Sequence, residues 1–134
     1  MKELFTPFSL YKKRARLIAI LWTLLVFTVC LMPAKDIPEI NVPLIDKWVH
    51  FLLFGAFAFF CLCSRPSKSF LFLFLIFVFS VFYGWLIETL QGAFPFLGRT
   101  YELMDIVADG IGGFIGITVF YFLFRYFEKR NVKS

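Results

Sequence analysis

Charged residues are scarce in this chain of 134 residues. Asp, Glu, Lys and Arg together make up 17% of it, whereas hydrophobic residues make up 60% and Phe alone occurs 21 times. A soluble domain has about a quarter charged residues, because polar side chains must cover much of its surface. The composition therefore excludes a soluble globular domain and indicates an integral membrane protein.

Several patterns that would indicate a known chemistry are also absent. The three cysteines, Cys30, Cys61 and Cys63, lie in or beside apolar runs, and an odd number in such places is no disulfide framework. The sequence lacks a Ser-His-Asp pattern, a Gly-rich phosphate loop, a nucleotide motif and an H-E-x-x-H spacing. We therefore predict no cofactor and no metal site.

Four apolar runs make up most of the chain. Each is close to the length of about 20 residues that a helix needs to cross the hydrocarbon core of a bilayer. The first run ends at Pro33 and has no signal-peptide cleavage pattern, so we predict that it stays in the membrane. The sequence predicts an all-α bundle, a single domain at 1–134 with transmembrane helices at about 17–33, 47–63, 70–91 and 103–126.

The basic residues are distributed unevenly and give the chain its net charge of +5. They gather in 1–16, in the turn at 64–69 and after the last run, whereas the loops at 34–46 and 92–102 hold few. Cytoplasmic segments carry such an excess of Lys and Arg, so both termini are predicted to be basic tails in the cytoplasm. We predict membrane lipids as partners and no nucleic acid; the oligomeric state is left open.

Three of the runs carry polar residues at the end that this topology places outside. The pairs are spaced three or four residues apart, so each pair shares one helix face: Asp46 and His50, Glu88 and Gln91, and Asp105 and Asp109. At a rise of about 1.5 Å per residue, all lie within roughly 10 Å of the outer hydrocarbon boundary. Lipid cannot hydrogen-bond these groups, so the three faces are predicted to turn inward and form one polar pocket.

Two glycines follow the acids on the last run. Gly112 and Gly116 share a helix face with Asp105 and Asp109 and form a G-x-x-x-G spacing. Small residues let two helices approach closely. We expect the last helix to be clamped there against another helix, which would fix the direction in which the acids point.

Four motifs follow one another at 44–120. They are Asp46-Lys47-Trp48-Val49-His50-Phe51, Glu88-Thr89-Leu90-Gln91, Pro95 followed by Gly98-Arg99, and Asp105 to Asp109 followed by Gly112. Together they resemble the motifs of the VanZ-like membrane proteins, although Asp109 stands where that family often has Asn. The family takes its name from a protein linked to teicoplanin resistance. The resemblance implies a small multi-pass protein of the bacterial inner membrane that works on lipids or cell-surface precursors.

His50 and three acids are the candidate catalytic residues. His50 would act as a general base oriented by Asp105 or Asp109, with Glu88 at the same depth. One alternative is a network of shared protons that only holds the bundle together. Another is a divalent metal ion held by His50 and the acids, which has the weakest support because no ligand spacing indicates it.

Asp46, Lys47, Gln91 and Arg99 are the candidate ligand-binding residues. A guanidinium at the outer mouth suits phosphate or carboxylate recognition, and an ion pair of Arg99 with Glu102 or Asp46 is an equal alternative. Lys47 is more often a residue whose stem stays in lipid while its ammonium reaches the interface.

Three functions fit these features. The first is an envelope protein whose outward-facing pocket acts on a lipid or on an anionic, lipid-linked cell-surface ligand, with an effect on glycopeptide susceptibility. The second is a non-catalytic protein that binds or shields the same lipid or a lipoglycopeptide. The third is a small proton-coupled transporter, which ranks last because nothing polar continues toward the cytoplasmic side.

Overall fold

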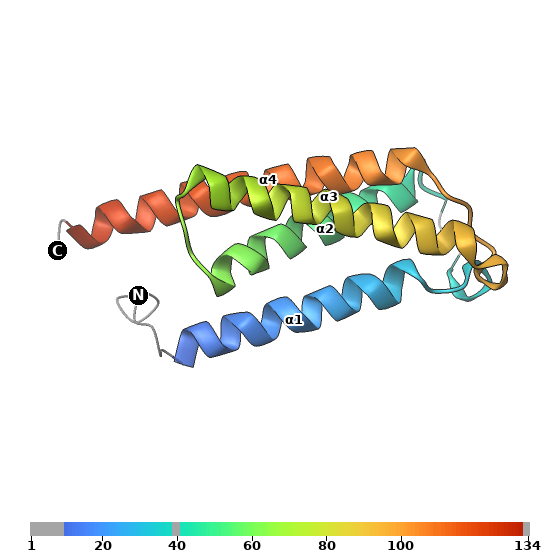
Figure 1. Ribbon diagram of the computed structural model, residues 1–134, viewed down its shortest axis with the longest axis horizontal. Coiled ribbons are helices and arrows are strands. Elements are labelled where there is room, and N and C mark those ends of the chain that lie inside the picture. The colour runs from blue at the N-terminus through green and yellow to red at the C-terminus, as the bar shows by residue number, and fades with distance from the viewer. Residues whose placement is uncertain (1–9, 39–40, 133–134) are drawn as a thin grey trace.

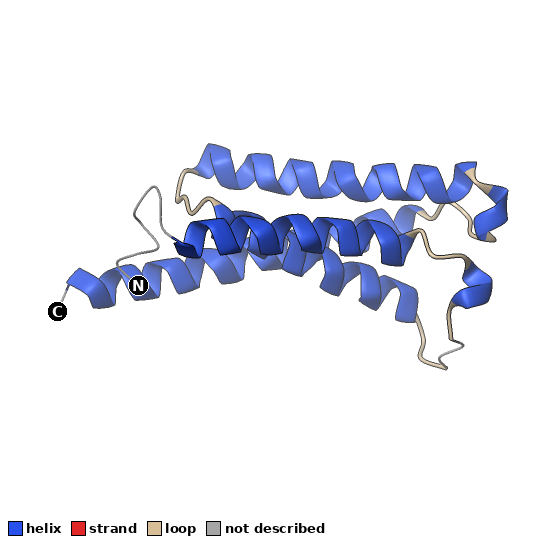
Figure 2. Cartoon of the chain, turned by 90° about the horizontal axis from the view of Figure 1, so that it is seen from below, coloured by secondary structure: helices blue, strands red, loops and turns tan. Residues whose placement is uncertain are grey.

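The described part of the chain is helical. The computed structural model describes residues 10–38 and 41–132, and no strand occurs among them (Figure 2). Two short 3-10 helices, η2 (Ala34–Asp36) and η3 (Pro95–Leu97), lie in the longer loops. The four α-helices of these residues are α1 (Leu10–Cys30), α2 (Ile45–Ser64), α3 (Phe70–Ala93) and α4 (Leu103–Val132). The predicted all-α fold is confirmed.

The helices alternate in direction along the bundle. Figure 1 shows that α1 and α3 finish at the end where α2 and α4 begin, and that η2 and η3 lie there too. We call this the loop end, and we call the opposite one, where α1 begins and α4 finishes, the terminal end. α2 contacts each of the other three α-helices, and α3 also contacts α4. The positions of the other helices are therefore set mainly by their packing on α2.

Three of the described helices have the length and composition of a membrane span. They cover Ile45–Ser64, Phe70–Ala93 and Leu103–Arg130. α1 is apolar from residue 17 onward, but it begins at Leu10 and therefore also contains a cluster of basic residues, Lys12, Lys13, Arg14 and Arg16. The sequence predicts four spans, and for α1 the span stays a prediction.

Both basic segments predicted as tails are partly helical. Residues 10–16 belong to α1, and α4 continues beyond residue 126 to Val132, so both helices extend beyond the predicted spans into segments that were expected to be irregular tails. The physical reason is that Lys, Arg and Glu are good helix formers, and extending an existing helix is easy once its first turn has formed. The remaining parts of the predicted tails, 1–9 and 133–134, lie outside the described residues.

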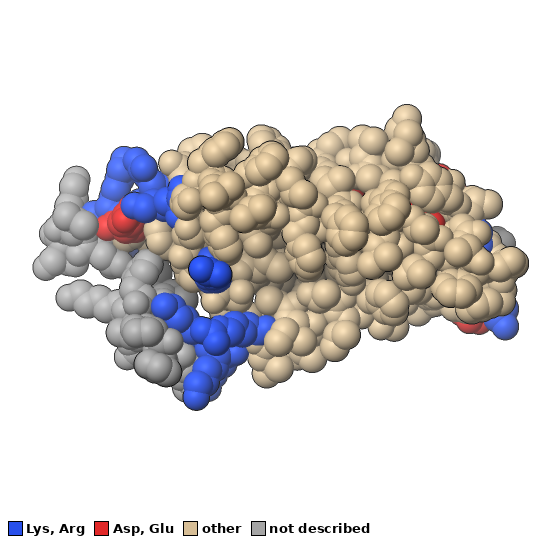
Figure 3. Space-filling model, viewed as in Figure 1, with Lys and Arg blue, Asp and Glu red and all other residues tan. Residues whose placement is uncertain are grey.

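The surface of the bundle has a broad belt without charge. Figure 3 shows Lys and Arg gathered at the terminal end and apolar or uncharged residues over the middle of the molecule. Large apolar side chains project from this belt, including Leu52 at 65% exposure, Phe114 at 61% and Phe82 at 53%. Such a belt is typical of helices that face hydrocarbon, and it agrees with a membrane protein.

Glycines bring α4 into backbone contact with α2. A Cβ atom on Gly112 would overlap the carbonyl oxygen of Phe51, and one on Gly116 would overlap the carbonyl oxygen of Gly55. A Cβ on Gly55 would lie 3.2 Å from the carbonyl oxygen of Gly112. The expected clamp is therefore confirmed, and its partner helix is α2. The clamp lies next to His50 on α2 and Asp109 on α4, on the side toward the terminal end. It therefore holds these two side chains at one depth.

Side chains of α1 and α3 attach α1 to the other helices through backbone carbonyl groups. Trp22 Nε1 donates a hydrogen bond to Leu53 O on α2 at 2.9 Å. Tyr83 Oη on α3 donates to Thr23 O on α1 at 2.8 Å. Hydrogen bonds of this kind hold α1 in register, so that its last turn lies beside the loop end.

Candidate functional site at the loop end

The eight predicted site residues lie at the loop end of the bundle. They come from α2, α3, the loop after η3 and α4. Five of their side chains are buried: His50, Glu88, Gln91, Asp105 and Asp109. The other three are half-buried at the rim: Asp46, Lys47 and Arg99. The structure thus brings the polar faces of α2, α3 and α4 to one place.

His50 is oriented by Asp109. The Nδ1 atom of His50 lies 3.0 Å from Asp109 Oδ1, and both side chains are buried. When Asp109 is ionised its carboxylate only accepts hydrogen bonds, so in that state Nδ1 carries the proton of this bond, and Nε2 is directed away from it. Nε2 lies 3.9 Å from Glu88 Oε1, which is too far for a hydrogen bond. Of the two acids that the sequence offered to orient His50, the structure selects Asp109.

Glu88 links α3 to the beginning of α4. Its Oε2 atom accepts a hydrogen bond from the backbone N–H of Glu102 at 2.8 Å, directly before α4 begins at Leu103. Its Oε1 atom is buried and has no hydrogen-bond partner among the described residues. An unpaired buried polar atom costs about 1–3 kcal/mol. Glu88 therefore has one structural oxygen and one oxygen that is directed at His50 without a bond.

Lys47 is the centre of a group of ion pairs. Its Nζ atom lies 2.6 Å from Asp46 Oδ2, 2.7 Å from Glu102 Oε2 and 2.9 Å from Asp105 Oδ1. Asp105 is buried, and Lys47 itself is only 20% exposed. Lys47 therefore does more than extend its ammonium to the membrane interface, because that ammonium binds three carboxylates. Glu102 was expected, if it paired at all, to pair with Arg99, and it binds Lys47 instead.

Gln91 and Arg99 hold the end of α1. Gln91 Nε2 donates to Cys30 O at 2.6 Å, and Arg99 Nε donates to Met32 O at 3.1 Å. A helix leaves its last carbonyl groups without intrahelical partners, and Cys30 is the last residue of α1. Within the described ranges Arg99 forms no ion pair, because the acids near it pair with Lys47. The alternative ion pair considered for Arg99 is therefore wrong.

A cavity of about 610 Å³ lies beside these residues. His50 and Asp105 line its polar wall, and Arg99 lies on its lining as well. Its apolar lining includes Val29 and Met32. The sequence predicts a pocket between the second, third and fourth runs but misses the contribution of α1. No charged residue at that end of the first run could have indicated it, and only the packing of α1 on α2 places it there.

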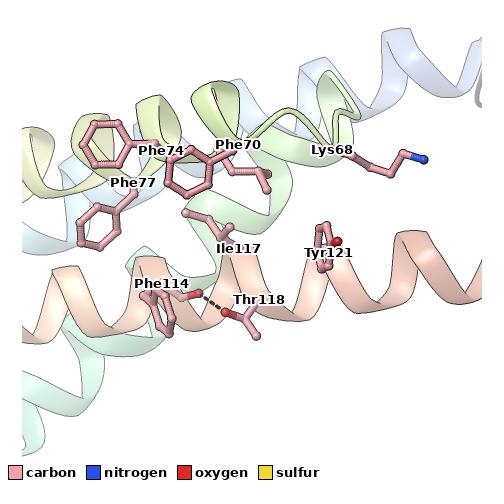
Figure 4. Close-up of a pocket in the computed structure, with 9 residues that line it drawn as sticks. Lys68, Phe70, Phe74, Phe77, Phe114, Ile117, Thr118 and Tyr121 are labelled. Atoms are coloured by element: carbon pink, nitrogen blue, oxygen red, sulfur yellow. Dashed lines mark hydrogen bonds between the residues drawn. The ribbon is translucent and has the colours of Figure 1, made fainter.

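A second cavity, of about 660 Å³, lies between α3 and α4 toward the terminal end (Figure 4). Phe70, Phe74 and Phe77 line it on one side and Tyr121 on the other, with Lys68 at one edge. No acid and no histidine is among its lining residues. It therefore offers an apolar groove without the reactive groups of the loop end.

A helical membrane protein with a buried cluster of one histidine and several acids at one end is the class that fold and site define. The family model described as VanZ/LLP1 matches residues 4–125, so the chain belongs to this family. The comparisons found no matching curated protein and no matching solved structure. The resemblance seen at 44–120 is thereby confirmed, and the match also includes α1.

Proposed function

We propose that this chain binds the headgroup of an anionic lipid, or of a lipid-linked cell-surface molecule, in the loop-end cavity and acts on it there. The observation that carries the proposal is the composition of that cavity. Its lining combines apolar side chains, such as Val29 and Met32, with Arg99 and the buried side chains of His50 and Asp105. A ligand with a hydrocarbon part and an anionic part matches both sides.

Arg99 is the group that would bind the anion. Its Nε atom is used by Met32 O, and no described carboxylate pairs with the guanidinium. A guanidinium has five N–H donors, so the terminal nitrogens remain for two parallel hydrogen bonds to a phosphate or carboxylate. Because Nε is already held, the guanidinium is oriented before a ligand arrives.

His50 is the group that would react. Asp109 holds its Nδ1 atom, Cys30 is a further side-chain hydrogen-bond partner of the ring, and His50 lines the cavity, so Nε2 is the nitrogen that would react. A protein that only shielded a lipid would gain nothing from the unpaired oxygen of Glu88 beside this nitrogen. Buried polar groups that lack a partner are costly and gather at functional sites. This arrangement favours an enzyme over a passive binder.

The loop end would face the outside of the bacterial inner membrane, with both termini in the cytoplasm and α1 as the fourth span. The support is the gathering of Lys and Arg at the terminal end (Figure 3). Positive residues near span ends remain in the cytoplasm. In this orientation the cavity faces the leaflet from which cell-surface precursors are used.

Binding is tested with the purified chain in nanodiscs that contain either phosphatidylglycerol or only phosphatidylcholine. We expect saturable binding of added phosphatidylglycerol and a rise of about tenfold in Kd for Arg99→Ala, since a charge-assisted hydrogen bond contributes about 1.5–3 kcal/mol. Lys68→Ala is the matched control, because Lys68 is a cation of the terminal end that pairs with Glu128. Equal affinities for both variants would refute the site.

Catalysis is tested by incubating the same protein with a lipid extract of the bacterial envelope and following the lipids by mass spectrometry. We expect a product that is absent with His50→Ala, and a change in teicoplanin susceptibility when the wild-type chain is expressed. Saturable binding without any product would instead assign the non-catalytic, shielding function. In that case His50→Ala should leave teicoplanin susceptibility at the wild-type level.

A further inference from the structure

We propose that His50, Glu88 and Asp105 hold one divalent metal ion of the Zn²⁺ or Mn²⁺ kind in the wall of the loop-end cavity. The role of this ion as the reactive group of the cavity rests on the proposed function. The geometry that supports metal binding does not depend on that function. One ligand atom from each of the three residues lies within 4.8 Å of the other two, and all three residues are buried.

The distances suit a small cation. Zn²⁺ binds nitrogen and oxygen at about 2.0–2.2 Å, so neighbouring ligand atoms in a tetrahedral site are roughly 3.4 Å apart. His50 Nε2 and Glu88 Oε1 are 3.9 Å apart, which is too long for a hydrogen bond and close to that separation. A side-chain movement of a few tenths of an ångström on each side would complete the pair.

The unpaired oxygen of Glu88 supports the metal site independently of these distances. Glu88 is 0% exposed, and its Oε1 atom has no hydrogen-bond partner in the part of the chain that the structure describes. Its other oxygen is fixed by the N–H of Glu102, so the carboxylate cannot turn away from His50 without losing that bond. An oxygen held in this way, buried and directed at a ring nitrogen, is the arrangement that a metal ion would complete.

Asp109 supplies the support that metal-binding histidines require. A histidine ligand usually donates its other ring N–H to a carboxylate, which fixes the ring and strengthens the ligand nitrogen. Asp109 accepts from Nδ1 of His50 at 3.0 Å and thereby directs Nε2 toward Glu88. The same contact suits a reactive histidine or a metal ligand, but the single lone pair of Nε2 serves one role at a time. With an ion bound, the ion would take the place of Nε2 as the reactive group.

The charge of the site also favours a cation. Five carboxyl groups gather at the loop end, and the structure pairs them with one lysine and one histidine: Asp46, Glu88, Glu102, Asp105 and Asp109, with Lys47 and His50. Buried charge without a counter-charge is costly in a low-dielectric interior. With His50 neutral, as a metal ligand requires, five carboxylates and one ammonium leave an excess of four negative charges, and a divalent ion would offset half of it.

A second group of acids can be set aside. Asp46, Glu102 and Asp105 also have oxygens within reach of one another, but the ammonium of Lys47 already lies among them. The ammonium group in that position already supplies the positive charge that a metal ion would bring. Asp105 has two oxygens, so it can bind Lys47 with one and a metal ion with the other.

Three protein ligands would leave one position of a four-coordinate ion for the ligand of the cavity. Catalytic zinc sites keep such a position open, whereas structural sites are closed by four protein ligands. His50 and Asp105 both line the cavity of about 610 Å³. An anionic oxygen of the bound headgroup could therefore reach the ion and be polarised by it.

The test measures metal binding by the full chain in nanodiscs after treatment with EDTA. Zn²⁺ and Mn²⁺ are titrated separately by calorimetry, and bound metal is counted by mass spectrometry. We expect one ion per chain and an affinity at least about 100-fold lower for Glu88→Gln, because one ligand is lost. Asp109→Asn should lower it by about 10–100-fold through His50. Glu128→Gln is the matched control, because Glu128 pairs with Lys68 at the terminal end, and it should bind as the wild type does.

Co²⁺ reports on the identity of the ligands, which a simple loss of affinity does not. Bound to the wild type, it should show the visible absorption of a site with nitrogen and oxygen ligands, and Glu88→Asp should shift the bands without abolishing them. Absence of a stoichiometric ion in the wild type, or equal losses in Glu88→Gln and Glu128→Gln, would overturn the metal site. Lipid binding without metal would refute this inference alone, and metal binding without lipid would refute the proposed function alone.

Discussion

Gly84 on α3 lies directly against the carboxyl group of Asp109 on α4. A Cβ atom at Gly84 would overlap Asp109 Oδ2 and would lie 3.0 Å from Asp109 Cβ. The absence of a side chain on α3 therefore creates the space in which Asp109 reaches His50. Three helices are involved in this one contact, because α2 supplies the histidine, α4 the acid and α3 the room for both.

Gly84→Ala should therefore displace Asp109 and weaken its bond to His50. Overpacking in a filled interior costs about 1–3 kcal/mol, which exceeds the gain of about 1 kcal/mol that Ala brings to a helix. We expect a lower thermal midpoint in detergent, measured by intrinsic fluorescence. Gly110→Ala is the matched control, since its Cβ would lie at an ordinary 3.5 Å from Val81 Cγ2, and it should be neutral or stabilising. Equal midpoints for the two variants would contradict the contact.

The sequence could predict the polar pairs of this site but not all of their contacts. Spacing alone places His50, Glu88 and Asp109 on inward faces at one depth, because lipid cannot satisfy them. Which acid orients His50 depends on the rotation of α4 about its axis. That rotation is set by backbone contacts at Gly112, which lies against the backbone carbonyl oxygen of Phe51. Because every residue has a backbone carbonyl group, this contact leaves no pattern in the sequence.

The residues that the sequence missed share a physical reason. Glu102 is a loop acid whose role appears only when α2 brings Lys47 to it. The end of α1 has no charged residue, and Thr28 there bonds within its own helix, so nothing in it indicates that Gln91 binds Cys30 O beside the cavity. The helices extend beyond the predicted spans where charged residues that favour helix continue an apolar run.

Asp109→Asn should preserve the fold. The side-chain amide oxygen of Asn can accept the hydrogen bond from His50 Nδ1 as the carboxylate does, and one buried charge is removed. Asp109→Leu keeps the branched shape of the side chain, with methyl groups in place of the oxygens, and leaves that N–H without a partner, which costs about 1–3 kcal/mol. The thermal midpoint should therefore fall in the order wild type, Asn, Leu, with only a small step to Asn. A Leu variant as stable as the Asn variant would show that the His50 bond contributes little.

Lys47 should contribute far more to stability than another lysine in an ion pair. Lys47→Met removes the ammonium among three carboxylates, one of them buried, and breaking such a pair costs about 3–5 kcal/mol when buried and less at a half-buried rim. Lys68→Met removes a pair whose side chains are 42% and 40% exposed, which contributes about 0–1 kcal/mol. Unfolding of both variants in a graded denaturant series measures the difference. Comparable losses would mean that the group around Lys47 is fully solvated.

Cysteine labelling tests the orientation of the bundle in cells. Thr100 at the loop end and Ser69 at the terminal end are both exposed. Each is replaced by Cys, one at a time, in a chain from which Cys30, Cys61 and Cys63 have been removed. Since positive residues stay in the cytoplasm, Thr100→Cys should react with a membrane-impermeant maleimide on intact spheroplasts. Ser69→Cys should react only after the membrane is opened. The reverse pattern would place the cavity in the cytoplasm and would exclude a ligand taken from the outer leaflet.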